Sequence, residues 1–201
     1  MKLKIVGLGD STTAGTPGYL SPIESPPDGA GDKKSQYSYW LMQSHGDWEV
    51  LNRGVNGERS DQILRRIARD VLQEEPEIAV ILAGVNDIYQ GFAADSITRN
   101  LSKMYSTCFQ ADIVPVACSI LPYNTMGKRE TLLRNKINDW IRSESRKLRM
   151  PFSDTAAAVS ASDNGDRLAG SPDGLHPDVA GYRSMAVAIG KTIEDYLAGL
   201  S

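Results

Sequence analysis

The histidine near the C-terminus, His176, stands three residues after an acid in the segment Asp173-Gly174-Leu175-His176. An acid at this spacing can fold back in a tight loop and hold one imidazole nitrogen, which leaves the other nitrogen to accept a proton. The chain has 2 histidines. The other, His45, follows a short predicted helix without a comparable acid, and we interpret it as structural or solvated. A lone histidine near a helix start is also typical of a surface position, so a catalytic interpretation of His176 requires a nucleophile elsewhere.

Ser11 is the candidate nucleophile, because Gly9-Asp10-Ser11 directly follows the first apolar run, residues 3–8. Serine oxygen is a poor nucleophile at neutral pH and needs a base to accept its proton. An acid-oriented His176 would supply that base. A serine at a strand-to-loop turn is also a common backbone cap, so the motif alone does not establish a nucleophile.

Two further polar segments follow apolar runs and offer hydrogen-bond donors. Asn52-Arg53-Gly54-Val55-Asn56-Gly57 ends the second run, and Gly84-Val85-Asn86-Asp87 follows the third. Acyl transfer builds negative charge on the carbonyl oxygen, so a hydrolase needs donors aimed at that point. A glycine N–H and an asparagine amide can both serve. Each segment taken alone is also typical of an ordinary turn.

The elements that must position these residues alternate between strand and helix. Short apolar runs predict strands at residues 3–8, 48–52, 78–83, 113–118 and 151–153. Helical spacing of apolar residues predicts helices at about 36–45, 63–72, 96–110, 128–149 and 182–200. The run 78–83 is apolar without alternation, as expected for a strand covered on both faces. The alternation of strands and helices along the chain predicts a parallel sheet with helices on both faces and ligands at the carboxyl ends of the strands.

Three segments lie outside the regular pattern and are predicted to be long loops at that carboxyl edge: residues 16–35, 120–127 and 155–172. Their apolar side chains would either line a substrate pocket near Ser11 or pack against the body of the domain. The residues that we expect in the pocket are Asp10, Tyr19, Tyr123 and Leu175.

Together the four polar segments resemble the conserved blocks of the SGNH hydrolases, a branch of the GDSL esterase/lipase family. The resemblance implies that Ser11 is the nucleophile and that Asp173 and His176 are its acid and base. It also implies an oxyanion hole formed by the Ser11 N–H, Gly57 and Asn86. The first block here reads Gly9-Asp10-Ser11-Thr12, with threonine at its variable fourth position.

One ambiguity concerns the second block, which contains two glycines. Gly54 competes with Gly57 for the oxyanion role, and the spacing typical of the family favours Gly57.

The fold that the resemblance implies is a flavodoxin-like three-layer α/β/α sandwich with a five-stranded parallel sheet, and we expect residues 1–201 to form a single domain. The implied function is that of a serine esterase that cleaves carboxylic esters. We favour short acyl groups, because the chain is small and has no separate lid domain. Carbohydrate O-acetylesterase, lysophospholipase and thioesterase activities at the same site are alternatives.

From a different class, the chain could be a non-catalytic ligand-binding module of flavodoxin type. Residues 7–12 have neither a GxGxxG pattern nor a P-loop lysine, which argues against a phosphate-binding module.

Charge and composition limit the classes of partner that we expect. The net charge of −3 with both signs interspersed gives no reason to expect nucleic acid or an anionic membrane. There is no apolar run of membrane-spanning length and no signal-peptide pattern, so we expect a cytoplasmic protein without integral membrane contact. The expected partner is a small-molecule ester, with no metal or organic cofactor. Oligomeric state is not readable from the sequence.

Two other groups of residues are interpreted as structural. Cys108 and Cys118 make no metal-ligand pattern and are expected to be reduced, partly buried thiols, although one disulfide is also compatible with the sequence. Basic residues cluster on two predicted helices, and we expect both clusters to be solvated faces. They are Arg65, Arg66 and Arg69 in one helix and Arg142, Arg146, Lys147 and Arg149 in the other.

Overall fold

The computed structural model describes residues 2–162 and 164–199, and its centre is a 5-stranded sheet with the order β4-β1-β5-β6-β7. All neighbouring strands pair in parallel. The strands are β1 (Leu3–Gly9), β4 (Trp48–Gly54), β5 (Ile78–Leu82), β6 (Val114–Cys118) and β7 (Phe152–Ser153). Each coincides with one predicted apolar run, so the predicted sheet is confirmed.

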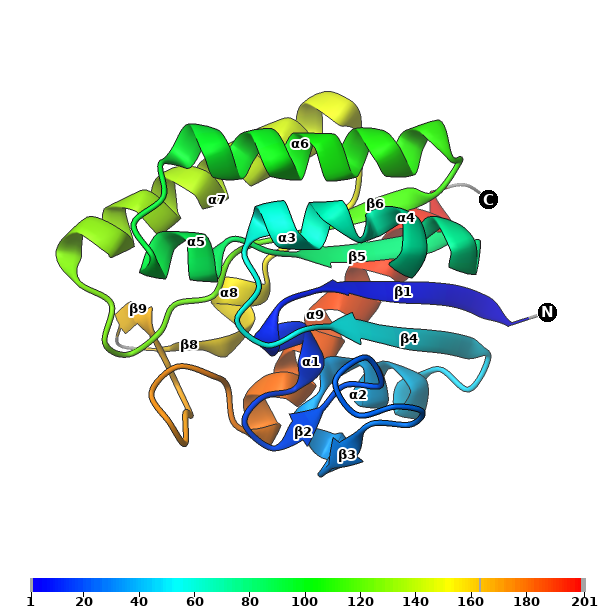
Figure 1. Cartoon of the computed structure of the whole chain (residues 1–201), viewed down its shortest axis with the longest axis horizontal. Helices are drawn as coiled ribbons and strands as arrows, with labels where there is room; N and C mark the ends of the chain where they lie inside the picture. The colour runs from blue at the N-terminus through cyan, green and yellow to red at the C-terminus, as the bar shows by residue number, and fades with distance from the viewer. Residues whose placement is uncertain (1, 163, 200–201) are drawn as a thin grey trace.

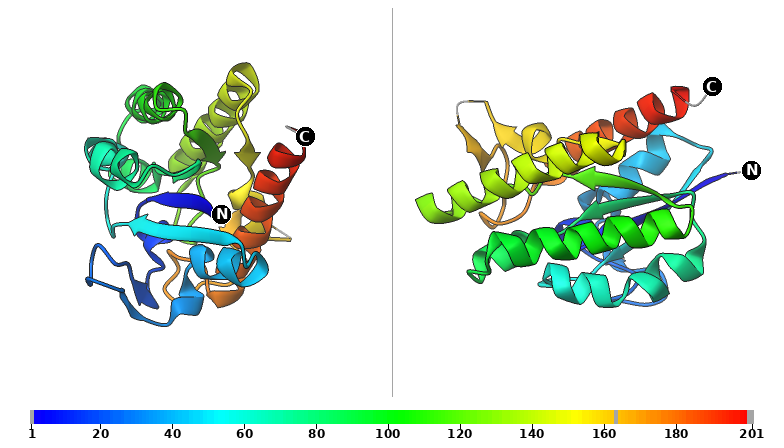
Figure 2. Two further views of the ribbon diagram at one scale, coloured as in Figure 1. Left: turned by 90° about the vertical axis from the view of Figure 1, so that its right-hand side faces the viewer. Right: turned by 90° about the horizontal axis from the view of Figure 1, so that it is seen from above.

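Helices cover both faces of this sheet, which gives the predicted three layers (Figure 1; Figure 2). On one face pack α3 (Ser60–Arg65), α4 (Ile67–Asp70), α6 (Ala94–Gln110) and α7 (Lys128–Leu148). On the other face pack α2 (Tyr37–Ser44), α8 (Thr155–Val159) and α9 (Val179–Ala198). Residue 200, which we expected at the end of the last helix, lies outside the described residues.

The central strand β5 shows why its sequence is apolar without alternation. Ile78, Val80 and Leu82 belong to the core cluster beneath α2 and α9, whereas Ala79 and Ile81 belong to the cluster beneath α3, α6 and α7. Successive side chains of a strand point to opposite faces. Because both faces are covered, all five side chains are buried.

The predicted helix at residues 63–72 is interrupted at Arg66, which separates α3 from α4. The prediction that all three arginines of this cluster are solvated is wrong for Arg66, whose side chain is only 7% exposed. The side chains of Arg65 and Arg69 are 69% and 61% exposed. Arg66 departs from the pattern because its guanidinium turns inward and donates to two backbone carbonyls at the ends of strands.

Two of the predicted loops contain regular structure. The first includes the antiparallel pair β2 (Tyr19–Leu20) and β3 (Ala30–Gly31) and the 3-10 helix η1 (Lys33–Ser35). The predicted loop at 155–172 contains α8 and the antiparallel pair β8 (Ser160–Ala161) and β9 (Asn164–Leu168). These short elements pair backbone groups that a long irregular loop would otherwise leave to solvent.

Both cysteines are free and fully buried, Cys108 on α6 and Cys118 at the end of β6. This agrees with the reduced thiols expected from the sequence and excludes the alternative of a disulfide between them in this structure. Over the part of the chain that the structure describes, no helix is both long and apolar enough to cross a membrane.

Candidate active site

The nucleophile candidate Ser11 is presented by α1 (Ser11–Ala14), a short helix that starts directly after β1. The Asp10 side chain caps this helix by accepting a hydrogen bond from the Thr12 N–H at 2.9 Å. Gly15 ends the helix in the left-handed conformation, with φ 109°. This sharp strand-to-helix turn places the Ser11 hydroxyl at the carboxyl edge of the sheet.

Asp10 itself is buried below the serine and is 1% exposed. Burial raises the pKa of its carboxyl to about 7, against the opposing effect of the hydrogen bond from Thr12. Asp10 is therefore a structural cap beneath the site and does not line the pocket where we expected it.

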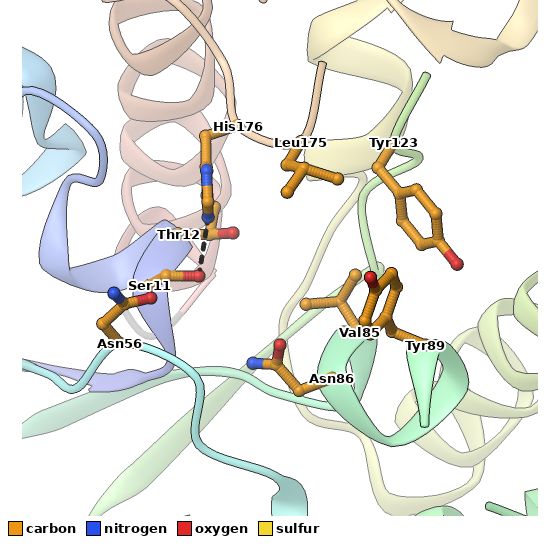
Figure 3. A pocket seen from close by; sticks show the side chains of 9 residues that line it. All are labelled: Ser11, Thr12, Asn56, Val85, Asn86, Tyr89, Tyr123, Leu175 and His176. Atoms are coloured by element: carbon orange, nitrogen blue, oxygen red, sulfur yellow. Dashed lines mark hydrogen bonds between the residues drawn. The ribbon is translucent and has the colours of Figure 1, made fainter. Parts of the chain in front are cut away.

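The structure brings Ser11, His176 and Asp173 into one hydrogen-bonded chain. Figure 3 shows the part of it between Ser11 and His176. His176 Nε2 lies 2.8 Å from Ser11 Oγ, and His176 Nδ1 lies 2.7 Å from Asp173 Oδ2. The other carboxylate oxygen, Asp173 Oδ1, accepts from the backbone N–H groups of Leu175 and His176 at 2.9 and 2.8 Å. The acid therefore folds back on the histidine, as its spacing suggested.

The electrostatics of Asp173 keep this carboxyl ionised. Partial burial raises its pKa, but the hydrogen bonds from His176 and from the backbone of Leu175 and His176 outweigh burial and hold the pKa below the ordinary value. An ionised carboxylate can only accept a hydrogen bond, so the imidazole carries its proton on Nδ1. The lone pair on Nε2 then faces the Ser11 hydroxyl, which is the arrangement that a general base requires.

Two of the predicted oxyanion donors, Ser11 and Asn86, line one pocket, whereas Gly57 is not among its lining residues. The Asn86 side chain lines the same pocket as Ser11 and uses one amide hydrogen to donate to the Glu58 carbonyl at 2.9 Å. Ser11 occupies the first position of its helix, where an N–H has no intrahelical acceptor. Within residues 2–162 and 164–199, the N–H groups of Ser11 and Gly57 donate to no acceptor. Of these two residues, Ser11 lines the pocket, so its N–H is free to bind a substrate oxygen there.

Glycine is required at the two glycine positions of the second block for different structural reasons. Gly54 is the last residue of β4, where an added Cβ would lie 2.0 Å from Ala14 N. Glycine at position 54 is thus required by the close approach of α1. Gly57 has a φ of 76° and open space around it, so its requirement is conformational. The structure gives Gly54 a packing role, and the oxyanion role of Gly57 stays a prediction.

A pocket of about 190 Å³ opens beside Ser11. Ser11 and His176 lie on one side of the pocket, and across from them lies a mostly apolar wall, with Asn86 next to Val85 on the wall side (Figure 3). Within this wall the rings of Tyr89 and Tyr123 pack edge to face, with centroids 5.8 Å apart. The lining residues are Ser11, Thr12, Asn56, Val85, Asn86, Tyr89, Tyr123, Leu175 and His176.

Two of the expected pocket residues, Tyr123 and Leu175, line this pocket, whereas Tyr19 does not. Tyr19 faces a separate hollow next to the first long loop, and its hydroxyl donates to the Asp28 carbonyl at 2.6 Å. That internal hydrogen bond turns the ring away from the serine.

Four lining residues were missed by the sequence analysis: Thr12, Asn56, Val85 and Tyr89. Asn56 and Val85 belong to the donor segments already singled out. Tyr89 lies four residues after Val85 on α5 (Val85–Tyr89), so helical spacing places both on one side of that helix.

His45 does not take part in this site. Its ring stacks on Trp48 at 3.8 Å, and its Nδ1 lies 3.7 Å from Glu194 Oε1. Among the described residues, no group of three or more His, Cys, Asp or Glu side chains is arranged to hold a metal ion.

Comparison with known proteins places this chain in a family. Residues 8–184 match the model of the GDSL-like lipase/acylhydrolase family, and the chain belongs to that family. An arylesterase from Vibrio mimicus is 32% identical over 126 residues, which are 63% of this chain and 58% of the arylesterase. The chain therefore matches little more than half the length of that relative.

Solved structures show the same fold. A lipolytic protein of the G-D-S-L family from Desulfitobacterium hafniense aligns with a TM-score of 0.80 at 21% identity, covering 95% of this chain and 99% of that one. A catalytic variant of an acetylxylan esterase from Geobacillus stearothermophilus aligns with a TM-score of 0.75 at 18% identity, covering 94% and 93%.

Proposed function

We propose that this protein is a serine esterase that hydrolyses carboxylic esters with short acyl groups through an acyl-enzyme on Ser11. The observation that carries the proposal is the continuous chain from Ser11 Oγ through His176 to Asp173, with contacts of 2.8 and 2.7 Å. Membership of the lipase/acylhydrolase family supports an ester as the substrate.

In the first half-reaction, Ser11 Oγ attacks the ester carbonyl carbon while His176 Nε2 accepts the hydroxyl proton. Asp173 stays ionised and stabilises the imidazolium that forms. The carbonyl oxygen becomes an oxyanion, which accepts hydrogen bonds from the N–H groups of Ser11 and Gly57 and from the Asn86 amide.

Collapse of this intermediate breaks the bond to the alcohol oxygen, and His176 donates its proton to that leaving alcohol. A water molecule then attacks the acyl-enzyme while His176 Nε2 accepts a proton from it. The second intermediate releases the carboxylic acid, and the proton returns to Ser11 Oγ. No redox step or co-reactant other than water is needed.

The size of the pocket supports a compact acyl group. Pockets for drug-sized ligands usually enclose about 300–1,000 Å³, and this one encloses about 190 Å³. Its apolar wall of Val85, Tyr89, Tyr123 and Leu175 suits an alkyl or aryl group next to the scissile bond.

The proposal is tested by kinetics on p-nitrophenyl esters of graded acyl length, with acetylated xylan, a lysophospholipid and an acyl thioester as alternative substrates. We expect kcat/KM to be highest for acyl groups of roughly two to four carbons, because longer chains exceed the pocket. Ser11→Ala should lower kcat by on the order of 10⁴–10⁶. Ser106→Ala, on an exposed position of α6, is the matched control.

If Ser11→Ala hydrolysed esters at a rate within tenfold of that of the wild-type protein, the proposed nucleophile would be excluded. A preference for acetylated xylan or a lysophospholipid over every short-acyl ester would assign one of the alternative substrates to the same site. If no ester is cleaved, the ligand-binding alternative is favoured.

A further inference from the structure

Arg66 lies beneath the active site and connects two strand ends that lead into it. Its Nη2 donates to the Gly9 carbonyl at 2.7 Å, and its Nη1 donates to the Arg53 carbonyl at 2.7 Å. Gly9 is the last residue of β1, two positions before Ser11. Arg53 is near the end of β4, four positions before Gly57. One guanidinium therefore binds a carbonyl at the start of each of two segments, the one that leads to Ser11 and the one that leads to Gly57.

A third contact extends this connection to Asn86. Arg66 Nε donates to Glu58 Oε2 at 2.6 Å, and Glu58 is the residue after Gly57. The backbone carbonyl of Glu58 accepts the hydrogen bond from the Asn86 side chain at 2.9 Å. The segments that carry all three candidate donors are thus linked through the pair of Arg66 and Glu58.

This arrangement is specific to the shape of arginine. A buried cation is costly unless its donors are paired, and Arg66 completes its pairing with Asp70 Oδ2 at 2.6 Å. The planar guanidinium presents donors in fixed directions, whereas a lysine ammonium is a point charge on a flexible stem. A lysine at this position would keep the charge but could not reach both carbonyls and Glu58 in the same geometry.

Alignment of the donors matters because an oxyanion hole depends on distance. The donors must lie close to their productive positions before the charge develops, and a misplacement of about 1 Å can cost on the order of 10²-fold in rate. Ser11, Gly57 and Asn86 come from three separate segments, after β1, β4 and β5. The relative positions of the donors therefore depend on contacts that join those segments.

We propose that Arg66 and Glu58 are positioning residues that align the three oxyanion donors. The inference rests on the proposed function, because it assumes that these donors bind a developing oxyanion. Neither side chain lines the pocket, so both act through the backbone and through Asn86.

The test is a double-variant cycle on the hydrolysis of p-nitrophenyl acetate. Arg66→Lys and Glu58→Gln are each combined with Asn86→Ala, and kcat, KM and Tm are measured for every protein. We expect Arg66→Lys to lower kcat by roughly 10–10²-fold with KM nearly unchanged. The combined loss with Asn86→Ala should be smaller than the product of the two single losses, because both act on one oxyanion site.

Arg69→Gln is the matched control. Arg69 also bonds to Asp70, but its side chain is 61% exposed and reaches neither strand carbonyl. It should keep the wild-type kcat. If Arg66→Lys does not fold, Glu58→Gln decides the question, because the Glu58 side chain is 20% exposed and its backbone carbonyl is unchanged.

The inference would be overturned if the loss of kcat in Arg66→Lys or Glu58→Gln multiplied fully with the loss in Asn86→Ala. It would also be overturned if both variants had a lower Tm and an unchanged kcat. These outcomes differ from failure of the proposed function, in which Ser11→Ala and Asn86→Ala themselves leave hydrolysis unchanged.

Discussion

Replacing Asp173 with asparagine is predicted to reverse the hydrogen bonding of His176 while preserving the shape of the site. Asp173 Oδ1 accepts two backbone N–H groups, from Leu175 at 2.9 Å and from His176 at 2.8 Å. Asparagine must therefore keep its carbonyl oxygen at that position and place its NH₂ group where Oδ2 now lies. Oδ2 is 2.7 Å from His176 Nδ1, so the new NH₂ group donates to that nitrogen.

The consequence for catalysis is a change of tautomer. When Nδ1 accepts a hydrogen bond, the imidazole proton resides on Nε2. Nε2–H then faces Ser11 Oγ, 2.8 Å away, and cannot accept the serine proton. A histidine held in the wrong tautomer lowers kcat by on the order of 10⁴, or about 5 kcal/mol of transition-state stabilisation. Because both backbone hydrogen bonds persist, the Tm should change by less than roughly 4 °C.

The assay is steady-state hydrolysis of p-nitrophenyl acetate at neutral pH, with Ser11→Ala as the blank. Asp178→Asn is the control, because Asp178 caps α9 through Gly181 N at 2.8 Å and asparagine caps a helix equally well. If Asp173→Asn retained more than a tenth of the wild-type kcat, the assignment of the His176 proton to Nδ1 would be refuted.

Two further predictions concern stability. Burial raises the pKa of Asp10 to about 7, so this carboxyl contributes stability that is fully present below its unfolded pKa of 3.8 and is lost as the pH rises through about 7. Asp10→Asn removes this titration and keeps an acceptor for Thr12 N, so its Tm relative to wild type should rise between about pH 4 and pH 8; an equal Tm difference at both pH values would contradict this. Gly54→Ala places a Cβ 2.0 Å from Ala14 N and should lower the free energy of unfolding by about 3 kcal/mol in chemical denaturation. Gly46→Ala has open space and should change it by less than about 0.5 kcal/mol, and equal effects of the two substitutions would refute the packing argument.

Much of the fold could be predicted because its signals are local. The strand β5 is an uninterrupted apolar run because helices cover both of its faces. The contact between Asp173 and His176 spans three residues, so its spacing was readable. Once the sheet was taken as parallel, Ser11 and the donor segments had to meet at one edge.

Other features depend on contacts that spacing does not encode. Arg66 has the sequence surroundings of a solvated helix face, and only the positions of two distant carbonyls show that it turns inward. Tyr19 and Tyr123 are both aromatic residues in loops near the carboxyl edge. An internal hydrogen bond to Asp28 directs the first away from the pocket, and packing against Tyr89 directs the second toward it. Residue type and loop location alone do not separate these two cases.

The proposed function depends above all on Ser11 as the nucleophile and on His176 as the base that activates it. The most direct measurement is mass spectrometry of the protein after reaction with a fluorophosphonate, with peptide mapping of the adduct and its rate of formation. We predict one adduct on the peptide that contains Ser11, none in Ser11→Ala, and labelling slowed by at least about 10²-fold in His176→Ala. An adduct on any other residue, or an unchanged labelling rate in His176→Ala, would contradict the claim.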